Sequence, residues 1–253
     1  MPRQDIISEL SETGLATVTI NRADAANAID TAMWESLPRI INKLIDDGAR
    51  LLIFTGSGKY FSAGADFEDL RQIKDYASAA RFWEAIATAL ETIASLEIPT
   101  IAMVNGPCLG GGCLLATACD LRFAARGAIF GIPVARLGII LDDSNIQRLV
   151  NLIGQAKTKE LIFSAATISS TTAETMGLIN HAVEDQELPG FTLKFAQDAL
   201  ANSSLTMAAT KASIARLNTD HHKGDAIKKS HEQDRAIVGY LSSDFRQRRD
   251  FEP

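Results

Sequence analysis

The segment VNGPCLGGGCLLATACD, residues 104–120, contains the residue types that most directly suggest chemistry. Its three consecutive glycines, Gly110–Gly112, precede an apolar run with helical spacing. Backbone N–H groups are therefore accessible where the positive end of a helix dipole favours an anion. A second glycine-rich loop, GSGKYFSAGADFEDL at 56–70, also follows a predicted strand. Two such N–H donors that converge on one carbonyl oxygen form an oxyanion hole.

The glycines of these two loops also allow other interpretations. They could simply form turns and let a helix pack closely on a sheet. A phosphate or dinucleotide loop is set aside, because the sequence contains neither G-x-G-x-x-G after a strand nor G-x-x-x-x-G-K-[ST]. Turn formation and oxyanion binding both stay open on the residues alone.

Two adjacent carboxylates are the candidate proton-transfer groups. The run RLGIILDDSNIQRLV, 136–150, places Asp142 and Asp143 between an apolar stretch and a predicted helix. Aspartate is a preferred helix N-cap, and a positioned carboxylate can also act as a general acid or base. Because a cap needs only one of the two, the other is available for chemistry.

The cysteines and histidines suggest structural rather than catalytic roles. The three cysteines, Cys108, Cys113 and Cys119, lie in one apolar segment without disulfide or metal spacing, which predicts buried thiols in a reducing compartment. Surface positions are expected for the four histidines, which all lie outside the two loops: His181, His221, His222 and His231. No metal site is predicted.

The elements that must position these residues follow from periodicity. Short runs rich in β-branched residues predict strands at 15–20, 51–56, 100–106 and 120–125. Longer segments with helical spacing lie between them, at 30–47, with Asp30 or Thr31 as the cap, and at 75–97. This alternation indicates an α/β layered fold, and helical patterns dominate after residue 145. We expect an α/β core at 1–200 and a helical region at 201–253.

Composition limits the classes of partner. The chain has 253 residues, 46% of them hydrophobic and 22% charged, and a net charge of −6 without long charge runs. This balance argues against nucleic acid or an anionic membrane as the partner. The amino terminus lacks a signal-peptide pattern, and no apolar run approaches the roughly 20 residues that span a membrane. The expected location is cytoplasmic.

Five motifs in this order and spacing resemble the crotonase family, also called the enoyl-CoA hydratase/isomerase family, over about residues 10–245: NRADAANAI, FSAGADFEDL, NGPCLGGGCLLATACDLRFAA, FGIPVARLGI and AETMGLINHAV. The resemblance implies an α/β spiral of ββα units with a C-terminal helical trimerisation region. It also implies an acyl-CoA thioester as the partner and a homotrimer or hexamer. Coenzyme A is then part of the substrate, and no separate cofactor is expected.

The resemblance carries roles over to individual residues. Ala65 and Gly111 match the two backbone donors that hold the enolate in this family. The segment that lies along coenzyme A, mostly through its backbone, corresponds to Ala63, Asp66, Phe67 and Glu68, with Ala26 where many members have a basic residue near the phosphates.

Both glutamates of the family's hydratases are missing. The first position, two residues after the glycine triplet, is Leu114, and the second, after the proline of the next motif, is Val134. Neither side chain can transfer a proton, so the two-glutamate hydration mechanism is unavailable.

Asp142 matches the catalytic carboxylate of other branches, the peroxisomal-type enoyl-CoA isomerases, the dienoyl-CoA isomerases and the 4-chlorobenzoyl-CoA dehalogenase. An insertion or gap in this loop would transfer the role to Asp143.

The expected activity is an enoyl-CoA isomerase with one carboxylate, from which apolar neighbours including Ile139 and Ile140 exclude water. The alternatives are a catalytically silent acyl-CoA binder and a CoA-thioester hydrolase, decarboxylase or dehalogenase. The nucleophilic dehalogenase mechanism is less favoured, since Val134 replaces its aromatic residue. The chain ends in SSDFRQRRDFEP, shorter than the family's last helix.

Overall fold

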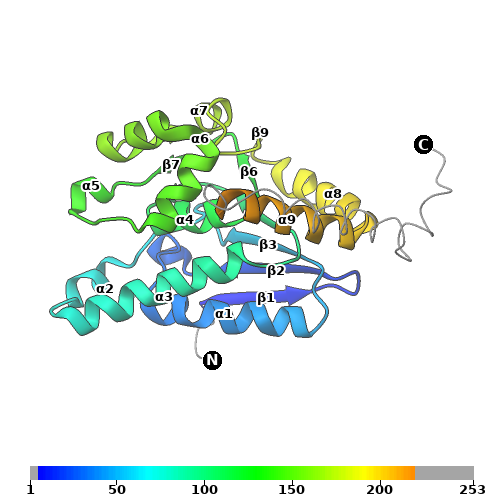
Figure 1. Cartoon of the computed structure of the whole chain (residues 1–253), viewed down its shortest axis with the longest axis horizontal. Helices are drawn as coiled ribbons and strands as arrows, with labels where there is room; N and C mark the ends of the chain where they lie inside the picture. The colour runs from blue at the N-terminus through cyan, green and yellow to red at the C-terminus, as the bar shows by residue number, and fades with distance from the viewer. Residues whose placement is uncertain (1–4, 220–253) are drawn as a thin grey trace, which may run out of the picture.

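Six strands form the main sheet in residues 5–219, the part of the chain that the computed structural model describes (Figure 1). Their order across the sheet is β1-β2-β3-β4-β6-β9, and only β1 runs antiparallel to its neighbour. The bounds are β1 Ile6–Leu10, β2 Leu15–Ile20, β3 Leu51–Gly56, β4 Thr100–Val104, β6 Leu121–Ala125 and β9 His181–Val183. A smaller sheet contains β5 Cys108–Leu109, β7 Ile129–Gly131 and β8 Ile168–Ser169 in the order β5-β7-β8.

Burial explains which segments become strands. In β2 every second side chain is buried, whereas all six residues of β3 are buried, as expected for a central parallel strand covered on both faces. The strands predicted at 15–20 and 51–56 are confirmed with the same bounds. Those predicted at 100–106 and 120–125 are each present but shorter, at Thr100–Val104 and Leu121–Ala125.

Helices connect the strands and begin at identifiable caps. The first, α1 Thr31–Asp46, starts at Asp30, whose carboxylate accepts a hydrogen bond from the Met33 N–H, and α3 Tyr76–Ala94 starts at a capping box of Asp75 and Ser78. The two helices pack against each other beside the sheet (Figure 1). The short helices near the loops are η1 Ala23–Ala25, α2 Phe67–Gln72, α4 Gly111–Ala118 and α5 Val134–Leu137.

The second half of the chain is mainly helical, as predicted, with α6 Asp143–Ser164, α7 Ser170–Thr175, α8 Leu188–Ala201 and α9 Ser204–Thr219. Lys211 connects α9 to the sheet region. Its Nζ donates hydrogen bonds to the Ile98 carbonyl at 2.9 Å and to Asp120 Oδ2 at 2.5 Å. The rest of the region expected at 201–253 lies outside the described residues, together with His221, His222, His231 and the SSDFRQRRDFEP end.

The short strands were not predicted. β8 and β9 contain two and three residues, too few for an alternating pattern to be recognised, and β1, β5 and β7 were missed as well. Among residues 5–219, no helix is both long enough and apolar enough to span a membrane.

Candidate active site

The two glycine-rich loops meet in space. Ser62 pairs with Cys108 and Ala65 with Ile29 in isolated parallel bridges, and the Leu109 N–H donates to the Ser62 carbonyl at 2.9 Å. A Cβ added to Gly64 would lie 2.8 Å from the Gly111 nitrogen. The backbones are therefore in direct contact, which explains why small residues are needed here.

Ala65 and Gly111 present adjacent backbone donors. A Cβ on Gly111 would lie 3.4 Å from the Ala65 nitrogen, and both residues are only partly buried. Gly111 is the first residue of α4, so its N–H has no acceptor within the helix. Among residues 5–219, neither N–H donates a hydrogen bond. Two unpaired donors this close together suit one carbonyl oxygen of a ligand.

Close packing accounts for the glycine triplet as well. A Cβ on Gly112 would stand 2.6 Å from the Ser62 Cβ, and one on Gly111 would stand 3.2 Å from Cζ2 of Trp34. Trp34 is fully buried, and the sequence offered no signal that it supports this loop. The glycines therefore allow tight packing and also leave the Gly111 N–H accessible, so the two interpretations of the triplet are compatible.

Asn27 joins the first loop to its neighbours and was missed by the sequence analysis. Its Nδ2 donates to the carbonyls of Ser57 at 2.8 Å and Tyr60 at 2.7 Å. Its own carbonyl accepts from Ser62 Oγ at 2.8 Å. The only signal available in the sequence is residue type, because Asn tolerates the left-handed backbone found here at φ 56°. Asn27 thus fixes the loop that carries Ala65.

The residues expected along coenzyme A have different environments. The Ala63 N–H donates to the Ala26 carbonyl at 2.9 Å, which brings these two positions together. Phe67 is 60% exposed, and the exposed Glu68 pairs with Arg71 at 3.0 Å. Contact with coenzyme A remains a prediction for all the residues that the resemblance assigns to it.

Asp66 has a structural use that the sequence analysis did not foresee. Its carboxylate accepts from Arg22 Nη1 and from the Glu68 N–H, both at 2.8 Å, and caps α2. Burial tends to raise the pKa of Asp66, but the hydrogen bonds with Arg22 and the backbone outweigh it and lower the pKa.

Asp66→Asn should therefore destabilise the protein at pH 7 and less so in acid. Because the folded-state pKa is lowered, the carboxylate contributes stability above its unfolded pKa of about 4, and this contribution is lost as the pH falls through the folded value. Denaturant unfolding of both proteins at pH 7 and at pH 3 measures the difference, with the exposed Asp46→Asn as a control. A difference that is equal at both pH values would contradict the assignment.

Asp142 caps α6. Its Oδ1 accepts from the Asn145 N–H at 2.9 Å and its Oδ2 from Asn145 Nδ2 at 2.8 Å, whereas Asp143 is the exposed first residue of the helix. Asp142 also lines a hollow of about 550 Å³ between α3 and α6. Other residues that line it are Trp83, Thr88, Glu91, Asn145 and Arg148. Ala65 and Gly111 do not line this hollow, so the catalytic role of Asp142 stays a prediction.

The apolar shield expected around the site is only partly present. Leu114 and Val134, at the two positions without glutamate, are buried, with 6% and 8% exposure. In contrast, Ile139 is 39% and Ile140 91% exposed, so the expectation that Ile140 excludes water is wrong for the described chain. The reason is that the chain reaches the surface before this point, since every residue from Ala135 to Ile140 is exposed.

The cysteines are buried, as predicted. Burial raises the pKa of Cys119 to about 12 and raises that of Cys108 well above its usual range. Within residues 5–219, no three His, Cys, Asp or Glu side chains gather as metal ligands would.

The native protein should therefore not react with a thiol reagent at pH 8, since all three thiols are buried and inaccessible to it. Absorbance with an aromatic disulfide reagent should show no rapid release in buffer and release from three thiols in denaturant. A thiol that reacts quickly in the folded protein would contradict this prediction.

Known proteins resemble the chain over most of its length. The model of the family described as enoyl-CoA hydratase/isomerase matches residues 11–243. Crotonyl-CoA hydratase from Syntrophomonas wolfei is 38% identical, covering 90% of this chain and 88% of the relative. Short-chain-enoyl-CoA hydratase from Clostridium acetobutylicum is 35% identical, covering 85% and 83%. The crystal structure of an enoyl-CoA hydratase from Bacillus anthracis superposes with a TM-score of 0.84 at 30% identity, covering 94% of this chain and 91% of that one.

Proposed function

Because the chain belongs to the enoyl-CoA hydratase/isomerase family, we propose that it acts on an acyl-CoA thioester as an enoyl-CoA isomerase with a single catalytic carboxylate. The observation that carries the proposal is the combination of two unpaired, adjacent backbone donors with aliphatic residues at both glutamate positions. The site can stabilise an enolate, but Leu114 and Val134 cannot deliver the two proton transfers of glutamate-assisted hydration.

The reaction assigns each group one task. The N–H groups of Ala65 and Gly111 hold the thioester oxygen as negative charge develops on it. The Asp142 carboxylate removes a C2 proton from a 3-enoyl ester, and the C2–H electron pair becomes part of a dienolate. The proton returns to C4, and the double bond moves from C3–C4 to C2–C3. Atoms and charge balance without water or a redox partner.

Two relatives are named as hydratases, so hydration is the reaction to distinguish. Purified protein should convert a 3-enoyl-CoA to the 2-enoyl isomer without a change in mass, as followed by absorbance and mass spectrometry. A product heavier by one water would support hydration instead. Release of free coenzyme A, detected with a thiol reagent, would support thioester hydrolysis.

A catalytically silent acyl-CoA binder is the second candidate. It is favoured by the position of Asp142, whose two carboxylate oxygens already accept hydrogen bonds from Asn145. Tight CoA-ester binding without any turnover of enoyl esters of several chain lengths would favour this candidate.

We further propose that the chain assembles as a homotrimer or hexamer. Apolar side chains that one subunit leaves exposed on α8 and α9 support self-association: Leu193, Phe195, Leu205, Ile214 and Leu217. Light scattering during size-exclusion chromatography should give three or six times the chain mass of 27.3 kDa. A monomer at micromolar concentration would contradict the proposal.

A further inference from the structure

Asp142 is held by more contacts than helix capping requires. A capping aspartate needs one carboxylate oxygen to accept a backbone N–H, and here Oδ1 performs this task with Asn145. The second oxygen accepts from the side-chain amide of the same residue at 2.8 Å. Asn145 is 2% exposed, so this amide is a buried group with a dedicated partner.

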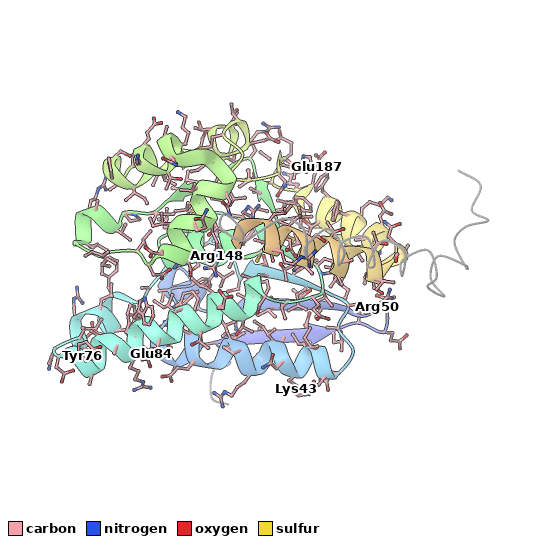
Figure 2. The ribbon with its side chains drawn as sticks, viewed as in Figure 1. Lys43, Arg50, Tyr76, Glu84, Arg148 and Glu187 are labelled. Atoms are coloured by element: carbon pink, nitrogen blue, oxygen red, sulfur yellow. The ribbon has the colours of Figure 1, made fainter. Side chains whose placement is uncertain are left out.

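Arg148 in turn holds Asn145. The Asn145 Oδ1 accepts from Arg148 Nη1 at 3.2 Å, and Arg148 Nη2 donates to Glu91 Oε2 of α3 at 2.8 Å. The Arg148 side chain, labelled in Figure 2, is only 16% exposed. Only one orientation of the amide places its NH₂ against the carboxylate and its oxygen against the guanidinium.

We propose that Asn145 and Arg148 are positioning residues for the carboxylate of Asp142, an inference that rests on the proposed function. The guanidinium draws electron density from Asn145 Oδ1 and makes the amide N–H a stronger donor to Asp142. The two hydrogen bonds from Asn145 thereby fix the orientation of the Asp142 carboxylate plane. Each oxygen retains a second lone pair that can accept a substrate proton.

This arrangement is not explained by the start of α6 alone. Oδ1 of Asp142 already satisfies the backbone at the helix start, so loss of the Asn145 side chain leaves the cap intact. A purely structural contact would also affect activity independently of Asp142. A positioning contact acts only through that carboxylate, and a double-mutant cycle separates the two cases.

The experiment compares Asn145→Ala with Asn151→Ala, an exposed asparagine on the same helix. We expect kcat of Asn145→Ala to fall on the order of tenfold with KM little changed. The unfolding temperature should also fall, because Asp142 and Arg148 lose a buried partner. Asn151→Ala should retain wild-type kcat. In the Asp142→Asn background, residual C2 proton exchange should be the same with Asn or Ala at 145.

Arg148 supplies a second measurement. Arg148→Lys keeps the charge and should retain more kcat than Arg148→Gln. Wild-type kcat in Asn145→Ala, or multiplicative losses in the double mutant, would overturn the inference. If Asp142→Asn itself leaves turnover unchanged, the proposed function fails in its choice of carboxylate, which is a distinguishable result.

Discussion

Asp142→Asn is expected to lower isomerisation by about 10²- to 10⁴-fold, the contribution typical of a positioned general acid or base. An amide cannot accept and return the substrate proton. Asparagine is as good a helix cap as aspartate, so residue 142 should still cap α6, which begins at residue 143. The change therefore removes the proton acceptor and retains the helix cap, while the oxygen that accepts from Asn145 Nδ2 is replaced by an NH₂ group.

The measurement is kcat with a 3-enoyl-CoA, together with the dissociation constant of an acyl-CoA by calorimetry. Binding should stay within about twofold, because Asp142 has no task in holding the thioester oxygen. Asp143→Asn is the matched control, since this neighbour is exposed and does not cap the helix. Full activity in Asp142→Asn, or loss of activity in Asp143→Asn, would contradict the assignment.

Gly64→Ala should have a comparable effect through the backbone. Its Cβ would lie 2.7 Å from the Leu109 carbonyl oxygen and 2.8 Å from the Gly111 nitrogen, closer than real Cβ contacts. The two loops must separate to admit it, which moves the N–H groups of Ala65 and Gly111 apart. Loss of one oxyanion donor typically costs roughly 10²- to 10³-fold in kcat, and a loss of this size is expected.

A control must separate this effect from backbone strain, because Gly64 has φ +97°. Gly48 adopts φ +102° but has open space around the position of a Cβ, so Gly48→Ala carries a similar strain without the collision. Both variants should lose thermal stability through the strained backbone, Gly64→Ala more because of the collision, and only Gly64→Ala should lose activity. Equal kcat values in the two variants would show that the loop contact has no role in turnover.

The strongly patterned elements were predictable from sequence. β2 and β3 have the predicted bounds because each is an apolar run of strand length whose side chains are buried in the sheet. Asp30 stands at the helix start expected of it, since capping is a local interaction. Strands of two or three residues, such as β8 and β9, depend on partners far along the chain and have no local pattern.

The sequence by itself determined the α/β class, the family, the two backbone loops and the absence of both hydratase glutamates, because these depend on residue type and order. Only the tertiary structure decided that Ala65 and Gly111 lie side by side, that Arg22 engages Asp66, and that Ile140 is exposed. It also decided the contacts from Asn145 through Arg148 to Glu91. These features join segments that are distant in sequence or depend on how a loop turns, and hydrogen bonds between them form only when the whole chain packs.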